Sequence, residues 1–439
     1  LARRERRGKE LMAPHSPTQP AQSTPTPRRW PGPERASRKD FLAVGAIVLV
    51  LVVVLAASWW GSDARRVEHT QASTLSAPAA AETAPTKLRE LWRGTSPQTV
   101  APILLSGGVL TAEDDVLSMH DLLSGEVAWT YDRGLPLCDV TFSNERIVAV
   151  YRGPKGCGDV VSLAAGTGEY AHTRSALAED SATALRSNDS TGIVSPHRVE
   201  LWRSDLVRTT EVGRQETQVK KEEQRYADCP FTSALTRTEL LATTQQCEGE
   251  DKMLLRLLKT KPERSDVPED LHTFYMPRDG QLVAIAQHHA AVYAPTGAGR
   301  DGKPQLIVAS DSGEVSHHPM PAAPVLADPP QDGPVLPVTA DLPHNMTWWT
   351  GNSVVGFHPT SLAPEFTVRG ALGAGANMAD RLLVPVEDGI RVFDTEHKKA
   401  ERTLPVRRDG LAAGAPVHLR VSGGFVVEQR GDELVVLGS

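Results

Sequence analysis

The distribution of apolar residues divides the chain into two regions. Residues 41–60, FLAVGAIVLVLVVVLAASWW, form one apolar run without a charged side chain. After about residue 88, apolar residues occur instead in short runs rich in Val, Leu, Ile and Thr, separated by Gly, Asp, Asn and Pro. A run of about twenty apolar residues has the length of a membrane-spanning helix. Short runs between turn residues predict β-strands.

We predict that residues 41–60 form a transmembrane helix retained in the mature protein, so the lipid bilayer is the first expected partner. The run ends in Trp59 and Trp60, an aromatic pair suited to the membrane–water interface. A cleaved export signal is the alternative, since the small residues just before Trp59 permit cleavage. The apolar core of a signal peptide is normally shorter than this run.

Charge predicts the orientation of the helix. Residues 1–40 contain ten Lys/Arg and four Asp/Glu and few apolar residues, so we expect a disordered, basic cytoplasmic tail under the positive-inside rule. The whole chain carries −7 and this tail +6, which leaves −13 for the part after residue 40. Residues 61–87, rich in Ala and Pro, are expected to link the helix to an extracytoplasmic domain, residues 88–439.

The strand pattern after residue 88 repeats. Stretches beginning at Val116, Val160, Leu306 and Ile390 each contain a strand, a polar turn and a returning strand, and two further apolar runs precede each stretch. In three of them the turn contains a glycine, which supplies the positive φ that a tight reversal needs. These turns are Ser124-Gly125-Glu126, Thr167-Gly168-Glu169 and Ser312-Gly313-Glu314.

Four antiparallel strands per unit, repeated about every 30–45 residues, are typical of a β-propeller. We therefore predict an all-β fold, a propeller of about eight blades, with seven as the alternative count. The units begin near Val100, Cys138, Ala182, Cys229, Gln281, Val335, Gly375 and Val417.

The last predicted unit has room for only three strands before Ser439. An isolated strand just after the linker, residues 88–93, resembles the outer strand of the other units. We predict that this strand, which carries Leu91 and Trp92, pairs with the C-terminal unit. Such pairing closes the ring and removes two exposed sheet edges at once.

The four cysteines all lie in the predicted extracytoplasmic part, where thiols oxidise. Two loops of nearly equal length favour pairing Cys138 with Cys157 and Cys229 with Cys247 among the three possible connectivities. Zinc is the alternative, but no CxxC pair is present and the spacings do not fit a zinc site.

These strand, Ser/Thr-Gly-Glu and aromatic-strand units resemble the repeats of PQQ-type (quinoprotein-like) propellers. The resemblance covers most of residues 88–439 and implies an eight-bladed ring that serves either as a quinone-dependent dehydrogenase or as a cofactorless envelope scaffold. It also implies that an enzyme of this kind carries adjacent cysteines, which are absent here. Trp348 and Trp349 offer a stacking surface, but neighbouring strand residues point to opposite faces, so we expect one to pack and one to be exposed. We expect no cofactor.

The paired histidines, His288-His289 and His317-His318, are also neighbours on predicted strands, so each pair supplies at most one ligand to a given face. We expect surface histidines and no metal. No motif of a serine nucleophile or a phosphate-binding glycine loop occurs in residues 88–439.

The sequence therefore predicts a single-pass protein of the bacterial cell membrane whose propeller is a non-catalytic interaction or assembly scaffold. Its acidic balance argues against nucleic acid as a ligand, because binding a polyanion requires a basic face. Another envelope protein or a neutral glycan is the expected partner. The alternative is an enzyme, either a quinoprotein-type dehydrogenase or a glycan-acting propeller.

Overall fold

The structure is a computed structural model that describes residues 36–215, 223–296, 302–324, 333–343 and 345–439. The predicted tail, residues 1–40, lies mostly outside these residues. The chain divides into two compact units, with the boundary between Ser62 and Asp63. Of the described elements, the first unit contains helix α1 and the second contains all the strands.

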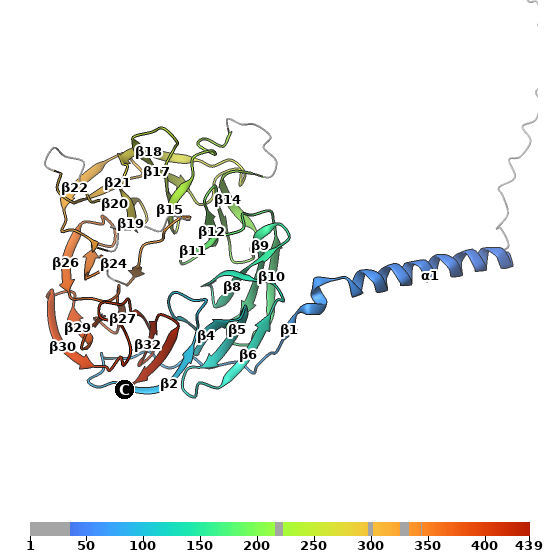
Figure 1. The fold of residues 1–439 in the computed structure, drawn as a ribbon, viewed down its shortest axis with the longest axis horizontal. Coiled ribbons are helices and arrows are strands. Elements are labelled where there is room, and N and C mark those ends of the chain that lie inside the picture. The colour runs from blue at the N-terminus through green and yellow to red at the C-terminus, as the bar shows by residue number, and fades with distance from the viewer. Residues whose placement is uncertain (1–35, 216–222, 297–301, 325–332, 344) are drawn as a thin grey trace, which may run out of the picture. The chain divides into compact units, whose positions relative to one another are not determined.

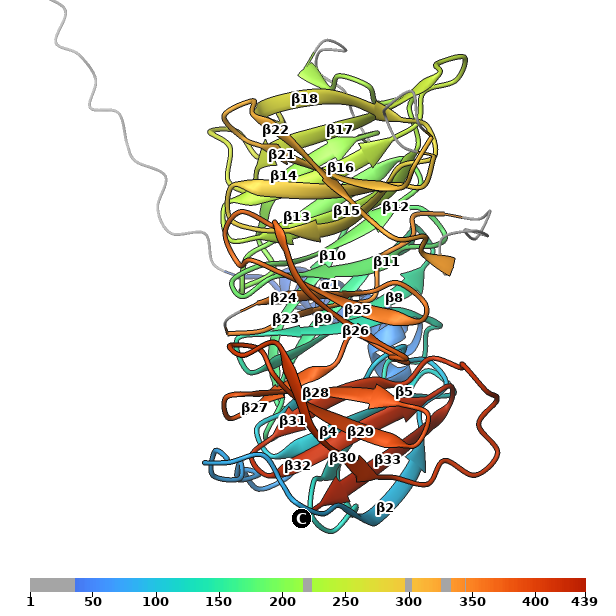
Figure 2. The same ribbon diagram turned by 90° about the vertical axis from the view of Figure 1, so that its left-hand side faces the viewer.

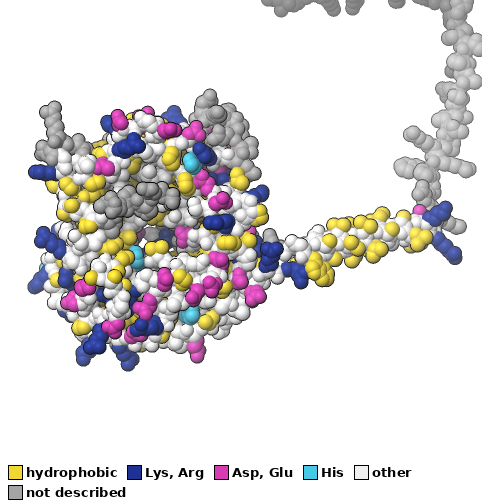
Figure 3. Space-filling view, in the orientation of Figure 1, with side chains coloured by type: hydrophobic (Ala, Val, Ile, Leu, Met, Phe, Trp, Pro, Cys, Tyr) yellow, Lys and Arg dark blue, Asp and Glu magenta, His cyan; other side chains and the backbone are white. Residues whose placement is uncertain are grey.

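Helix α1 (Arg38–Trp60) includes the whole predicted membrane span. Ser37 and Asp40 form a capping box at its start, in which the Ser37 backbone N–H donates to the Asp40 carboxylate at 2.6 Å. Apolar side chains surround the helix (Figure 3), and none of its residues is buried. Among the described residues, α1 is the one helix with the length and composition to cross a membrane.

Within the described residues, the second unit contains eight antiparallel sheets arranged around a central axis (Figure 1). The first four blades are β3 (Ile103–Leu105), β4 (Gly108–Glu113), β5 (Val116–Asp121) and β6 (Val127–Asp132); β7 (Leu137–Ser143), β8 (Arg146–Gly153), β9 (Gly156–Ala164) and β10 (Tyr170–Ser175); β11 (Thr183–Arg186), β12 (Thr191–Ser195), β13 (Arg198–Trp202) and β14 (Arg208–Gly213); and β15 (Phe231–Arg237), β16 (Leu240–Gln245), β17 (Lys252–Lys259) and β18 (Asp270–Pro277).

The remaining blades follow the same order, from an inner to an outer strand. They are β19 (Gln281–Ile285), β20 (His289–Ala294), β21 (Gln305–Ser310) and β22 (Val315–Pro319); β23 (Thr339–Asp341), β24 (Met346–Trp349), β25 (Ser353–Phe357) and β26 (Pro364–Arg369); β27 (Ala376–Met378), β28 (Arg381–Val386), β29 (Gly389–Asp394) and β30 (Lys399–Pro405); and β31 (His418–Ser422), β32 (Phe425–Arg430), β33 (Glu433–Gly438) and β2 (Arg89–Thr95). Each predicted unit start lies within four residues of the first residue of an innermost strand.

The ring closes in the last blade, as predicted. Strand β2 pairs antiparallel with β33, with Trp92 opposite Val436. The C-terminus lies beside β2 in both Figure 1 and Figure 2. Leu91 occupies an irregularity in this pairing, and Leu91 and Trp92 both pack against a buried cluster that joins the last blade to the first. Strand β33 is therefore paired on both sides, with β32 and with β2.

Glycine turns create contacts between neighbouring blades. Gly168 has φ +76°, and a Cβ there would lie 2.8 Å from the ring of Trp129, on the outer strand of the preceding blade. Gly125 has the same relationship to Trp92, and Gly313 to His272. In these three turns glycine is therefore needed for two reasons: it permits a positive φ, and its lack of a Cβ lets an aromatic or imidazole side chain approach closely.

The predicted linker, residues 61–87, is ordered along much of its length. It contains η1 (Asp63–Arg66) and β1 (Glu68–His69), which adds to the outer edge of the first blade beside β6. Further on, the Leu75 N–H donates to the Gly166 carbonyl at 3.2 Å, and Ala84 is buried. Such backbone contacts have no signature in an Ala/Pro-rich sequence.

Candidate functional site

The central channel of the ring contains a cavity of about 500 Å³. Its lining comes from the innermost strands β3, β7, β11, β15, β19, β23 and β31, and from Ala374 and Gly375 just before β27. All eight blades therefore contribute to one site.

Arg186 is the last residue of β11 and lines this cavity. Its guanidinium carbon lies 4.1 Å from the centre of the Phe142 ring, on β7 of the preceding blade. The side chain is accessible to water, yet protein surrounds it, as expected for a group inside a channel. This surrounding protein lowers the pKa of Arg186 by desolvation.

Arg420 and His418 lie two residues apart on β31, so both side chains point to the same side of that strand. Desolvation, followed by the nearby charge of Arg186, lowers the pKa of Arg420 to about 10. The guanidinium thus remains charged at neutral pH. Desolvation and then the charge of Arg420 lower the pKa of His418 to about 4, so its imidazole is neutral there.

The carboxylates of the lining already have partners. Asp341 forms an ion pair of 2.7 Å with Arg237. Asp139, on β7, accepts hydrogen bonds from its neighbour Val140 and from the Ala184 N–H of the next blade, both at 2.7 Å. Burial raises the pKa of Asp139. These bonds connect the inner strands of adjacent blades along the channel wall.

The cavity is locally basic although the chain is acidic overall. Among the described residues, its lining contains three arginines and two aspartates. Among the described residues, no carboxylate forms an ion pair with Arg186 or Arg420. Within the part of the chain that the structure describes, the only side-chain hydrogen bond of Arg420 runs from Nη1 to the neighbouring Leu419 carbonyl, at 3.0 Å. Most of the N–H groups of both guanidiniums are therefore available to a ligand.

Both predicted disulfides are present, and both have the local pairing. Cys138 and Cys157 join β7 to β9 across β8 in the second blade. The second bridge, between Cys229 and Cys247, lies just outside the β15–β16 hairpin of the fourth blade.

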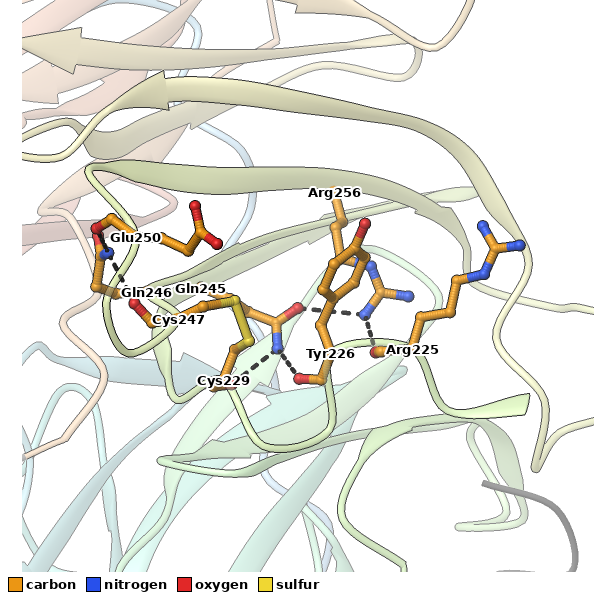
Figure 4. The surroundings of a disulfide bond; sticks show 8 residues. All are labelled: Arg225, Tyr226, Cys229, Gln245, Gln246, Cys247, Glu250 and Arg256. Carbon is orange, nitrogen blue, oxygen red and sulfur yellow. Dashed lines mark hydrogen bonds between the residues drawn. A yellow bond between two sulfur atoms is a disulfide. The ribbon is translucent and has the colours of Figure 1, made fainter. Parts of the chain in front are cut away.

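The second disulfide is embedded in a buried polar network (Figure 4). Gln245 donates from Nε2 to the Cys229 carbonyl at 2.9 Å and accepts from Arg256 Nη1 at 3.2 Å. Arg256 is fully buried and pairs with Asp270 at 2.8 Å. Its charge is therefore satisfied within the blade, unlike that of the channel arginines. This is a structural network.

The other residues that the sequence singled out lie away from the channel. Trp59 and Trp60 end α1 and are exposed. His288 bonds to Asp311 on the surface. Among the residues that the structure describes, no group of three or more His, Cys, Asp or Glu side chains is placed to hold a metal ion.

The expectation that one of Trp348 and Trp349 is exposed is wrong, because both are buried, at 0% and 5% exposure. They lie on β24, and both faces of a propeller blade are covered by the neighbouring blades. Trp348 contacts Tyr293 of the fifth blade, and Trp349 donates to the Ala371 carbonyl at 2.8 Å. Neither ring offers a stacking surface to a ligand.

Sequence reasoning did not identify the channel arginines. A signal was present, because Arg186 ends the short apolar strand TALR and Arg420 follows His418 in HLRVS. Charged residues on the first strand of a repeat unit point to the channel. The sequence does not show which residues of the innermost strands meet at the channel axis.

No protein-family model matches the sequence, and no curated protein matches it. Among solved structures, the chain is similar to AztD of Citrobacter koseri, with a TM-score of 0.44 and 13% sequence identity. The match covers 73% of this chain and 87% of that chain.

Proposed function

We propose that the protein is a membrane-anchored, extracytoplasmic propeller of the bacterial cell envelope that binds a partner and catalyses no reaction. The observation that carries this proposal is the chemistry of the channel. Guanidinium groups bind ligands but do not exchange protons near neutral pH. The Asp139 carboxylate is bonded to two backbone N–H groups, and the pKa of His418 lies far below neutrality. Such a lining is suited to binding rather than to acid–base catalysis.

The proposed partner is another envelope protein or a neutral glycan. Strand β1 favours a protein, because this two-residue strand from outside the repeats adds to the outer edge of the first blade. An extended segment of a partner can add to an outer edge in the same way, through main-chain hydrogen bonds. The acidic net charge again argues against nucleic acid.

The orientation and family resemblance belong to the same proposal. The basic tail favours a cytoplasmic N-terminus, and two disulfides favour an oxidising compartment for residues 63–439. The contacts of Gly125 with Trp92 and of Gly168 with Trp129 give the Gly-containing turns and the aromatic strands a shared structural role. This supports kinship with PQQ-type propellers, as a member without a cofactor.

Capture from detergent-solubilised membranes tests the proposal. The bait is the tagged full-length chain, and the control joins residues 1–62 to an unrelated soluble domain, so that the tail and helix are matched. We expect one protein or glycan to be retained in fixed ratio with the full-length chain alone. Reduction of a redox dye by the full-length protein loaded with PQQ and Ca²⁺ would contradict a non-catalytic role.

A further inference from the structure

We propose that the central channel is a binding site for a small organic anion, held by the guanidinium groups of Arg186 and Arg420 through a carboxylate or a phosphate. The inference rests on the proposed binding role and names the ligand class of that site. Both side chains line the same cavity, one from the third blade and one from the eighth.

Most guanidinium N–H groups of these two arginines have no hydrogen-bond partner among the described residues. The guanidinium carbon of Arg186 lies over the Phe142 ring, and among the described residues no hydrogen bond engages its N–H groups. Arg420 donates one hydrogen bond, from Nη1 to the adjacent Leu419 carbonyl. A planar guanidinium with free N–H groups matches the geometry of a carboxylate or phosphate, with which it forms two parallel hydrogen bonds.

The channel pair differs from the fully buried arginines of this protein. Arg256 is buried with Asp270, and Arg408 is buried with Glu428, at distances of 2.8 and 2.7 Å. Buried guanidinium groups are normally paired in this way. Arg186 and Arg420 instead line a cavity, where desolvation and then the charge of Arg186 lower the pKa of Arg420. An anion between them would remove that repulsion.

The remainder of the lining indicates the size and character of the ligand. A cavity of about 500 Å³ holds a small molecule. Apolar side chains including Ile103, Leu235 and Ile285 share the wall with hydroxyl groups such as Thr141 and Thr236. The ligand therefore combines an anionic group with a compact, partly apolar body.

The carboxylates of the wall do not cancel this attraction. Asp341 is paired with Arg237, and its effect on the pKa of Arg186 is smaller than that of desolvation, which lowers it. The Asp139 carboxylate accepts hydrogen bonds from two backbone N–H groups. The acidic exterior opposes large polyanions, whereas one small anion needs only the local field of the two arginines. The site thus selects small anions over nucleic acid.

Calorimetric titration of the full-length protein in detergent, with citrate and with inorganic phosphate as probes, tests this site. We expect wild-type protein to bind at least one probe. The double variant R186Q/R420Q should weaken that binding tenfold or more, since the loss of a charge-assisted hydrogen bond removes at least about 1.4 kcal/mol. R186K, which keeps the charge but not the planar fork, should give an intermediate affinity.

R203Q is the matched control, because Arg203 is an exposed arginine paired with Asp205, and it should leave probe affinity unchanged. Thermal melting shows whether each variant is folded, and R186K serves should the double variant fail to fold. Lack of binding by wild-type protein, or equal binding by folded R186Q/R420Q, would overturn the anion site. If either result were obtained while a partner is captured, the proposed partner-binding role would be retained and only the anion site rejected.

Discussion

The indole Nε1 of Trp92 donates a hydrogen bond of 2.9 Å to the backbone carbonyl of Leu122. Trp92 lies on β2 of the last blade, and Leu122 follows β5 of the first. The contact recurs one blade further on, where Trp129 Nε1 donates to the Ala165 carbonyl at 2.8 Å. The interface that closes the ring therefore repeats an interface within it.

Replacing Trp92 should destabilise the propeller in two distinguishable steps. W92F keeps an aromatic side chain but loses the indole hydrogen bond to the Leu122 carbonyl. It should lower the free energy of unfolding by about 1 kcal/mol. W92A also loses the packing against Gly125 and should cost about 2–4 kcal/mol, because the side chain is only partly buried. Urea denaturation measures both values. A W92A protein as stable as the wild type would show that β2 is not part of the ring.

The glycine turns permit a matched comparison. G168A adds a Cβ at φ +76° that would lie 2.8 Å from the Trp129 ring, whereas G410A adds one at φ +84° with nothing within 4 Å. We expect G410A to cost about 1 kcal/mol through backbone strain alone. G168A should cost about 3 kcal/mol because the ring must also move. Thermal melting of the two variants in parallel gives the difference, and equal melting temperatures would refute the ring contact.

From the two disulfides we predict both the redox state of the compartment that holds the propeller and their contribution to its stability. When cells are quenched with an alkylating reagent, all four cysteines should remain unmodified until a reductant is added. Removing either bridge, as C138A/C157A or C229A/C247A, should lower the free energy of unfolding by about 3 kcal/mol, because each bridge closes a loop of similar length. Immediate alkylation in untreated cells would place the propeller in a reducing compartment.

His418 predicts a specific loss of stability in acid. Its pKa is about 4 in the folded protein, below the ordinary value of 6.5, because of desolvation and the charge of Arg420. The folded state therefore resists protonation, and its stability advantage is present above pH 6.5 and is lost as the pH falls toward 4. The loss should reach about 3 kcal/mol. Denaturation of wild type and H418Q at pH 7, 5.5 and 4.5 tests this, since H418Q should lack that part of the decline. Parallel curves would contradict it.

Much of the fold was predictable because the strands of a propeller recur along the chain at regular intervals. The turns at Gly125, Gly168 and Gly313 marked the same position in three units, and the missing fourth strand of the last unit indicated the role of residues 88–93. These features are local in sequence. By contrast, the contact of His272 with Gly313 has no tryptophan to reveal it, although it occupies the same structural position.

The binding chemistry of the channel was not predictable, because it depends on which residues of eight separate strands meet at the axis. Arg186 and Arg420 are more than two hundred residues apart and look like ordinary strand charges in isolation. The whole-chain charge of −7 also pointed away from a basic site. Only the closed ring shows that two positive groups share one cavity while the neighbouring carboxylates are already bonded.

Closure of the ring depends on the pairing of β2 with β33, and a cross-link tests that pairing most directly. Thr95 lies opposite Glu433 in the β2–β33 register. Oxidised T95C/E433C should form a new disulfide, seen as a change in mobility on a non-reducing gel that reductant reverses. T95C/K399C, which places the second cysteine on the outer strand of the seventh blade, should not. Cross-linking in neither protein, or equally in both, would contradict a ring closed by β2.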